Sequence, residues 1–274
     1  MKQQQSTSRN RPRPFGLALL CALVVGALIA LAMPSAYAFS NGQDASLVLG
    51  QTGFTGNTSA NGAARMNSPR GVAVDPNTGR VFVADASNNR VLRFASLEAL
   101  ANGASAEAVL GQTNFTNTGS ASGQNRMNSP RDVFVDSAGR LWVADTGNNR
   151  VLRFNNAATL NNGANASGVL GQTNFTNTGS AFGQNRMNGP EGVFVDSAGR
   201  LWVADTGNNR VLRFNNAATL SNGTNASGVL GQSGYGFGNT GTGTAQDRMN
   251  APRGVAVDSA GRLWVADTGN NRVL

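Results

Sequence analysis

The sequence has no histidine and only one cysteine, Cys21. Histidine is the side chain that most often moves a proton near neutral pH, so histidine acid–base catalysis and histidine metal sites are excluded. A single cysteine also excludes an intramolecular disulfide. Stability must therefore come from packing, which a chain of 274 residues is long enough to provide.

Positive charge is scarcer than the formal net charge of +8 suggests. Four of the 22 basic residues precede the first apolar run, which leaves 18 basic residues against 14 acidic ones, a net charge of +4. The remaining arginines recur at fixed intervals and do not cluster. Because a nucleic-acid binder needs a basic patch, we expect no nucleic-acid partner.

The amino terminus has the pattern of an export signal. Basic residues precede an uncharged run over residues 15–33, which is followed by Pro34 and the small-residue sequence Ala36-Tyr37-Ala38. This pattern is typical of a secretory signal peptide that is cleaved after residue 38. The run is also long enough to span a bilayer, so an uncleaved anchor is the alternative. We expect residues 39–274 to be secreted or displayed at the cell surface, with membrane contact only through such an anchor.

The rest of the chain is repetitive. Residues 109–168 and 169–228 differ at only six positions, and looser copies flank them, which gives repeat units at about 46–94, 107–154, 167–214 and 227–274. A supersecondary unit of this size cannot bury its apolar face alone. It must stack on its neighbours, as in propellers and solenoids.

Each copy contains three short runs that favour β-strands. In the third copy they cover residues 190–195, 201–205 and 210–214, and a fourth run at 227–231 completes a four-stranded antiparallel sheet. The first two runs are apolar on both faces, so both faces must be covered. Sheets that pack face to face around an axis meet this need. We therefore expect Trp142, Trp202 and Trp264 to be shielded from water.

These copies resemble NHL repeats. The resemblance rests on the patterns Pro-x-Gly-Val-x-Val-Asp, Gly-Arg-Leu-Trp-Val-Ala-Asp and Thr-Gly-Asn-Asn-Arg-Val, in copies that begin at Pro69, Pro130, Pro190 and Pro252. It implies an all-β fold, a β-propeller of NHL type with about four four-stranded antiparallel blades. The repeat period of 60 to 62 residues exceeds the usual propeller period of about 40 to 50, because two polar connections are long.

The number of blades has two interpretations. The chain opens with a fourth-type run at residues 46–50 and stops at Leu274 within a third-type run. The opening run could complete the last sheet and close a four-bladed ring. Alternatively, the sequence is a fragment of a larger propeller with six blades, and we favour this second interpretation because the resemblance implies six.

Recurrent aspartates follow the first and second strands of every copy. We expect each to accept turn amides of a hairpin, with a glycine in the positive-φ conformation, and to pair with the recurrent arginines Arg90, Arg150, Arg210 and Arg272. One carboxylate per loop falls short of a calcium site, so no metal and no cofactor are predicted. The aspartates with this structural hairpin role are Asp75, Asp85, Asp136, Asp145, Asp196, Asp205, Asp258 and Asp267.

The long connections should emerge on one rim of the propeller, where binding residues of rigid scaffolds usually lie. Each connection between blades carries an aromatic residue near its start, which either pins the loop to a blade or contacts a partner. These rim-loop aromatics are Phe54, Phe115, Phe175, Tyr235 and Phe237.

A second candidate site is a ring at the start of the innermost strands. Arg131-Asp132 in one copy becomes Glu191-Gly192 in its near-identical neighbour. A charge reversal where few other positions differ favours a polar binding ring, although neutral drift explains it equally well. The predicted channel-mouth ring consists of Arg70, Arg131, Glu191 and Arg253.

The sequence thus predicts an exported, non-catalytic scaffold that binds a protein or a glycan through its rim loops. No catalytic residue is assigned. The peptide-amidating lyases resemble this scaffold, but their zinc chemistry relies on histidines that are missing here. Two alternatives remain: a hydrolase or lyase that uses carboxylates or a metal, and a structural repeat array at the cell surface.

Overall fold

The computed structural model describes residues 40–232 and 242–274. The chain divides into a leading unit, Met1–Asp44, and a second unit, Ala45–Leu274, which contains all the described strands. The predicted signal peptide or anchor at residues 1–38 lies outside the described residues. Among the described residues, none belongs to a helix with the length and apolar character needed to cross a membrane.

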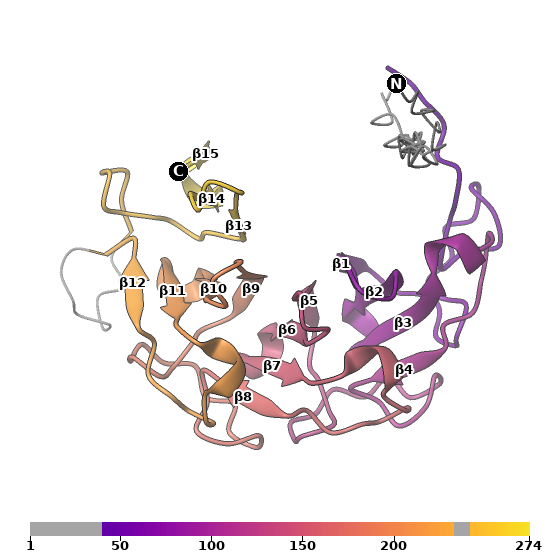
Figure 1. The fold of residues 1–274 in the computed structure, drawn as a ribbon, viewed down its shortest axis with the longest axis horizontal. Coiled ribbons are helices and arrows are strands. Elements are labelled where there is room, and N and C mark those ends of the chain that lie inside the picture. Colours follow the sequence, from indigo (N-terminus) through magenta and orange to yellow (C-terminus); the bar gives the residue numbers. More distant parts are fainter. Residues whose placement is uncertain (1–39, 233–241) are drawn as a thin grey trace, which may run out of the picture. The chain divides into compact units, whose positions relative to one another are not determined.

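Four antiparallel sheets make up the second unit (Figure 1). The first sheet contains β1 (Pro69–Val74), β2 (Arg80–Asp85), β3 (Arg90–Ser96) and β4 (Ala108–Leu110). The second contains β5 (Pro130–Val135), β6 (Leu141–Asp145), β7 (Arg150–Phe154) and β8 (Gly168–Leu170). The third contains β9 (Pro190–Val195), β10 (Leu201–Asp205), β11 (Arg210–Phe214) and β12 (Gly228–Leu230). The fourth contains β13 (Gly254–Val257), β14 (Leu263–Asp267) and β15 (Arg272–Val273).

The short helices are 3-10 turns that follow the second and third strands. Those after second strands are η1 (Ala86–Asn88), η3 (Thr146–Asn148), η5 (Thr206–Asn208) and η7 (Thr268–Asn270). Those after third strands are η2 (Leu97–Ala99), η4 (Ala157–Thr159) and η6 (Ala217–Thr219). The fold is therefore all-β, as predicted.

The sheets follow one another along an arc, with the first strand of each sheet on the inside (Figure 1). β1 packs beside β5, β5 beside β9 and β9 beside β13. Glycines allow this close approach. A Cβ at Gly71 would lie 2.6 Å from the Asp132 Cα atom, and one at Gly192 would lie 2.3 Å from the carbonyl oxygen of Arg253. The inner strands of neighbouring sheets therefore touch through their backbones.

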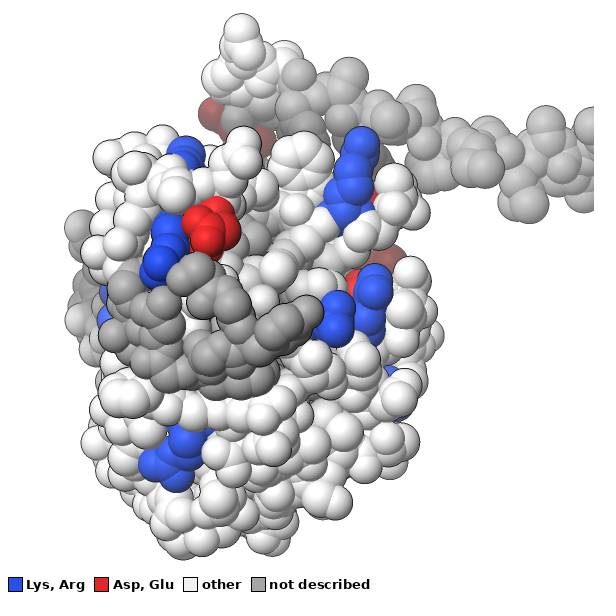
Figure 2. Space-filling view, turned by 90° about the vertical axis from the view of Figure 1, so that its left-hand side faces the viewer, with Lys and Arg blue, Asp and Glu red and all other residues white. Residues whose placement is uncertain are grey.

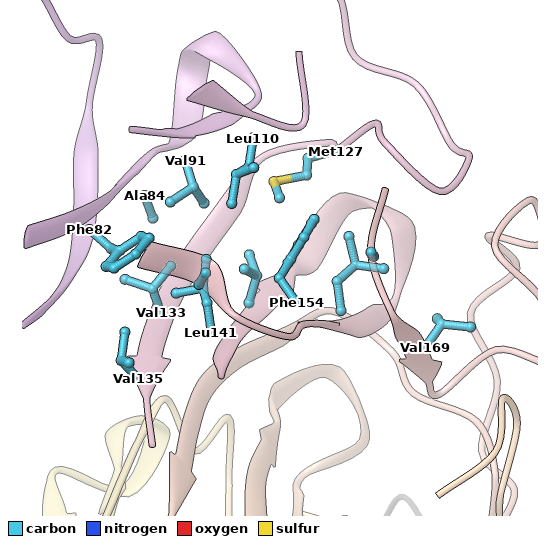
Figure 3. Close-up of a cluster of buried hydrophobic side chains, with 14 residues drawn as sticks. Phe82, Ala84, Val91, Leu110, Met127, Val133, Val135, Leu141, Phe154 and Val169 are labelled. Atoms are coloured by element: carbon cyan, nitrogen blue, oxygen red, sulfur yellow. The ribbon is translucent and has the colours of Figure 1, made fainter. Parts of the chain in front are cut away.

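Apolar side chains fill the space between successive sheets. One cluster joins Phe82, Ala84 and Val91 of the first sheet to Val133 and Leu141 of the second (Figure 3). A second cluster repeats this arrangement between the second and third sheets, and another lies between the third and fourth. Burial of each such side chain contributes about 1.5–3 kcal/mol, so neighbouring sheets stabilise one another.

The expectation of a fourth-type strand at residues 46–50 is wrong. The fourth sheet has three strands among the described residues, and residues 46–50 do not form a strand. The Val48 amide instead donates to Asn102 Oδ1 at 2.9 Å, as the Val109 amide donates to Asn162 Oδ1 at 3.0 Å. The opening segment thus lies against the loop after β3 of the first sheet, where the same contacts recur. It does not complete the fourth sheet.

Each of the three tryptophans makes an equivalent hydrogen bond, but the three side chains differ in burial. Their indole N–H groups donate to Asp136, Asp196 and Asp258 at 2.9, 2.9 and 3.0 Å. Trp142 is 1% exposed and Trp202 7%, as predicted, whereas Trp264 is 47% exposed. The difference arises because no described sheet covers this face of the fourth one.

These tryptophans allow a test of sheet stacking within one chain. We expect Trp142→Ala to lower the free energy of unfolding by about 3–5 kcal/mol, because it leaves a cavity between two sheets. Trp264→Ala should cost clearly less, since its ring is already half in water. Urea unfolding followed by circular dichroism measures both. Equal losses would contradict mutual shielding of the sheets.

Candidate functional site

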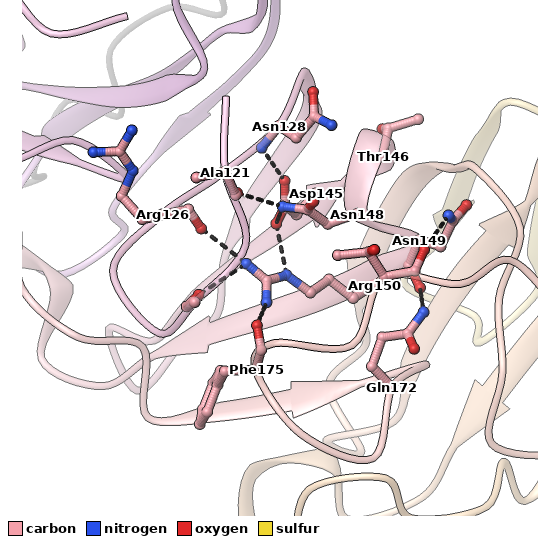
Figure 4. Close-up of polar contacts among 12 residues, drawn as sticks. Ala121, Arg126, Asn128, Asp145, Thr146, Asn148, Asn149, Arg150, Gln172 and Phe175 are labelled. Carbon is pink, nitrogen blue, oxygen red and sulfur yellow. Dashed lines mark hydrogen bonds and ion pairs between the residues drawn. The ribbon is translucent and has the colours of Figure 1, made fainter. Parts of the chain in front are cut away.

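An Asp–Arg ion pair flanks the second hairpin of each sheet, and it is fully buried in the first three sheets. In the second sheet, Arg150 Nε donates to Asp145 Oδ2 at 2.7 Å, and both side chains are fully buried. The Asn148 amide donates to the same oxygen at 2.8 Å, and the backbone N–H of Asn128 donates to Asp145 Oδ1 at 2.7 Å (Figure 4). The predicted pairing with the recurrent arginines is confirmed for the aspartates after the second strands. The aspartates after the first strands pair instead with the arginine four residues later in the second, third and fourth sheets.

The same guanidinium also binds both long loops beside it. Arg150 Nη2 donates to the carbonyl oxygens of Gly123 and Arg126 at 2.9 and 2.8 Å, and Nη1 donates to the carbonyl of Phe175 (Figure 4). The first two carbonyls belong to the loop that enters the second sheet, and the third belongs to the loop that leaves it. We call this arrangement the loop clamp. The Asp–Arg pair recurs with Asp85 and Arg90, Asp205 and Arg210, and Asp267 and Arg272. Arg90 also binds carbonyls of both flanking loops, and Arg210 and Arg272 bind carbonyls of the loop that enters their sheet.

Burial of the clamp removes hydration from its charged groups, which costs free energy. Loss of hydration raises the pKa of Asp145 and of Asp205, although the positive charges of Arg150 and Arg210 act in the opposite direction. A buried pair of this kind adds little net stability compared with apolar residues, but breaking it leaves an uncompensated charge. The clamp therefore contributes geometry: it fixes loops that contain few apolar residues of their own.

The two hairpins of each sheet use their aspartates differently. In the first hairpin, Asp136 Oδ1 accepts the amides of Ala138 and Arg140 at 3.0 and 3.1 Å, and Gly139 has φ 72°, as predicted. Burial acts to raise the pKa of the equivalent Asp196, but hydrogen bonds from Trp202 and Arg200 outweigh it and lower the pKa.

The prediction for the second hairpin is wrong in two respects. Asp145 accepts no backbone amide from that hairpin, because its oxygens bind Arg150, the Asn148 side chain and the backbone N–H of Asn128. The positive φ belongs to Asn149, at 54°, and not to the glycine. Gly147 serves close packing instead, since a Cβ there would lie 2.5 Å from Asn128 Cγ. Asparagine tolerates this left-handed conformation better than most residues.

The rim-loop aromatics divide into anchored and exposed residues. Phe115 and Phe175 are half-buried against apolar clusters, and their carbonyls accept from Arg90 and Arg150. They pin the loops. Phe54 is 55% exposed, and Tyr235 and Phe237 lie outside the described residues. Sequence reasoning missed Phe182, which is 59% exposed where the preceding copy has Ser122. The copy-to-copy difference was the available signal.

The structure brings three of the four predicted ring residues together. Arg131 Nη1 lies 2.6 Å from Glu191 Oε1, and Arg253 Nη1 lies 3.3 Å from Glu191 Oε2. One carboxylate thus joins three neighbouring sheets. Arg70, at the same position of the first sheet, is exposed and forms no ion pair within the part of the chain that the structure describes. The ring carries more positive than negative groups.

Asp132 is a further titratable residue beside this ring. Its Oδ2 accepts the Val193 amide of the next sheet at 2.9 Å, and its Oδ1 accepts the Val133 amide at 2.9 Å. Burial raises the pKa of Asp132 to about 6, because loss of hydration outweighs these two hydrogen bonds. The sequence showed that Asp132 replaces the glycine found in other copies, but not that its carboxylate bridges two inner strands.

Charge elsewhere on the molecule is dispersed. On the face shown in Figure 2, the positive side chains stand singly or in pairs among mostly uncharged residues. No group of three or more histidine, cysteine, aspartate or glutamate residues within residues 40–232 and 242–274 is arranged to hold a metal ion.

Comparison with known proteins agrees with this architecture. A sequence model of the NHL repeat matches residues 66–94, 127–154, 187–214 and 249–274, which are the hairpins of the four sheets. The packed antiparallel sheets define the class as a β-propeller. The chain contains four NHL repeats, arranged as the packed sheets of a β-propeller.

Curated relatives share part of the chain. The mouse protein NHL repeat-containing protein 3 is 26% identical over 157 residues, which are 54% of this chain and 39% of the mouse protein. The human protein of the same name is 25% identical over 157 residues, with the same coverage. This chain therefore spans about two fifths of the length of these relatives.

Solved structures support the fold. An auxiliary nutrient binding protein from Bacteroides ovatus matches with a TM-score of 0.50 and 13% identity, over 77% of this chain and 48% of that one. A protein of unknown function from Bacteroides thetaiotaomicron matches with a TM-score of 0.50 and 14% identity, over 75% of this chain and 46% of that one. At these identities the likeness concerns the fold alone.

The loop clamp can be tested by removing one charge. We expect Arg150→Gln to lower the free energy of unfolding by about 3–5 kcal/mol, because Asp145 is left buried without its partner. The loops it holds should also become easier to cleave by protease. Arg272→Gln is the matched control, since the Arg272 side chain is 28% exposed, and it should cost less. Equal costs for the two variants would contradict the account.

Asp132 predicts a pH dependence of stability. Its folded pKa of about 6 lies above the ordinary aspartate value, so the folded state holds this proton more tightly than the unfolded state. The stability that protonated Asp132 contributes is present below about pH 4 and is lost as the pH rises through 6. Relative to Asp132→Asn, the native chain should lose about 2–3 kcal/mol between pH 4 and pH 8. A difference that stays constant over this range in urea titrations would refute the prediction.

Proposed function

We propose that the chain is an exported, non-catalytic scaffold that binds a protein or glycan partner through its long-loop rim and channel-mouth ring. The proposal places it outside the cytoplasm, secreted or at the cell surface, and needs neither cofactor nor metal. Export rests on the sequence pattern of residues 1–38. The observation that carries the binding role is the ring itself: Arg131, Glu191 and Arg253 come from three sheets and meet at one carboxylate.

Rigidity of the rim supports a binding role. In the second sheet, the loop clamp holds the loop on either side by hydrogen bonds to its backbone carbonyls, so these loops enter a binding event already ordered. Pre-ordered loops lose less conformational entropy when a partner binds. A set of polar loops on a stacked β-scaffold is also the usual setting of recognition residues.

The divergence between near-identical copies points to the same rim. Six positions differ between residues 109–168 and 169–228, and four of them lie in the loop that enters the inner strand or at the start of that strand. Their residues in the third copy are Phe182, Gly189, Glu191 and Gly192. Change concentrated on one rim supports a surface that is adapted to a partner.

A carboxylate-dependent hydrolase is the second candidate. The observation in its favour is the raised pKa of Asp132, since such shifts cluster at functional sites. Both Asp132 oxygens, however, accept backbone amides, and the recurrent aspartates are occupied by hairpin amides, tryptophan or the loop clamp. The scaffold role is therefore better supported.

An exchange of charges tests the proposed binding role. The full chain is screened against arrays of extracellular proteins and glycans, and any ligand found is titrated with the double variant Arg131→Glu, Glu191→Arg. We expect its affinity to fall by about tenfold, because the exchange reverses the ring's charge pattern while preserving one ion pair.

The matched control exchanges another ion pair, Arg80 and Glu107, which lie 3.0 Å apart outside the ring. Arg80→Glu, Glu107→Arg should leave the affinity unchanged. If a ligand binds both double variants with the same affinity as the native chain, the ring is not part of the binding site. Circular dichroism must first show that both variants are folded.

A further inference from the structure

The channel-mouth ring contains an uncompensated arginine. Glu191 is shared by Arg131 and Arg253, whereas Arg70 has no acidic partner among the described residues. Asp132, the other acidic residue nearby, gives its two oxygens to the backbone amides of Val133 and Val193. Arg70, Arg131 and Arg253 thus face two carboxylates, those of Glu191 and Asp132, which leaves one positive charge in excess at the ring.

Glu191 shows how this ring holds a carboxylate. One oxygen pairs with Arg131 of the preceding sheet and the other with Arg253 at the start of the following sheet. Arg131 uses one nitrogen, Nη1, for this contact, and a guanidinium has five N–H donors. Arg131 therefore has N–H donors left for a second anion, and β1, which carries Arg70, packs beside β5, which carries Arg131.

The surroundings favour a hydroxyl-rich ligand over a peptide. The rim loops consist mainly of asparagine, threonine, serine and glycine, whose amide and hydroxyl groups match sugar hydroxyls. Their exposed large apolar residues in the described part of the chain are Phe54 and Phe182. A protein interface usually needs a more apolar centre than this. The exposed Phe182 ring offers a flat apolar face to a sugar ring.

We propose that the channel-mouth ring binds an acidic oligosaccharide, with one uronate carboxylate between Arg70 and Arg131. This inference rests on the proposed binding function of the same rim and names its ligand class. Charge-assisted hydrogen bonds from two guanidinium groups give the carboxylate its affinity, and the polar loops orient the sugar. Binding weakens as salt increases, because both arginines are partly exposed.

The test uses isothermal titration of the full chain with three probes: tetragalacturonate, neutral maltotetraose and a tetraglutamate peptide. We expect tetragalacturonate to bind most tightly. Arg70→Gln should weaken this binding by about tenfold, and Glu191→Gln should strengthen it by about threefold because it frees Arg131 and Arg253. Arg262→Gln removes an exposed arginine from the hairpin between β13 and β14, at the other end of β13 from Arg253, and should leave binding unchanged.

Three results would overturn the inference: no binding of tetragalacturonate, equal binding of maltotetraose, or unchanged binding by Arg70→Gln. Preference for tetraglutamate would replace the oligosaccharide by an acidic peptide. In each case the proposed function is judged separately: it stands if the arrays still yield a ligand that the Arg131 and Glu191 exchange weakens, and it falls if they do not. Melting curves of each variant confirm that loss of binding is not loss of fold.

Discussion

The buried pair of an aspartate and an arginine in each sheet is the interaction on which the rest of the structure depends. Apolar contacts alone can hold stacked sheets together, but they cannot order the long polar loops between the sheets. These loops are polar and rich in glycine, and they contribute little apolar surface of their own. The guanidinium of Arg150 solves this problem by binding carbonyls from two successive loops, while Asp145 fixes the guanidinium and a loop amide. One buried charge pair thus converts two flexible connections into a fixed rim.

The channel-mouth ring is a consequence of this arrangement combined with close packing at the centre. Glycines at positions 71 and 192 let neighbouring inner strands touch, which brings residues at the same repeat position within ion-pairing distance across sheets. In a chain whose copies are nearly identical, such positions would carry like charges and repel one another. The replacement of arginine by Glu191 relieves that repulsion and leaves an asymmetric ring. Asp132 adds a group whose pKa of about 6 makes its charge sensitive to pH.

Much of the fold could be predicted from the sequence, because recurring local sequence patterns specify each strand and the first hairpin of each sheet. Short runs of β-favouring residues between turn signals located the strands, and the Asp-Ser-Ala-Gly turn located a positive-φ glycine. Asp–Arg pairing also followed from recurrence. The clamp on the loops could not be predicted, because its acceptors are backbone carbonyls, which no residue type signals. The role of Asp132 depends on the neighbouring inner strand, and the exposure of Trp264 depends on which sheets lie beside it.

The most direct test of the loop clamp is native-state hydrogen exchange at the amides of Asn128 and Asn188, which donate to Asp145 and Asp205 at 2.7 Å from loop positions. If the clamp orders the rim, these amides exchange only through opening of the sheets, with protection equal to that of Val143 and Val203 in the buried strands. Exchange as fast as that of exposed loop amides would show that the loops move independently of the buried pair and would contradict the account.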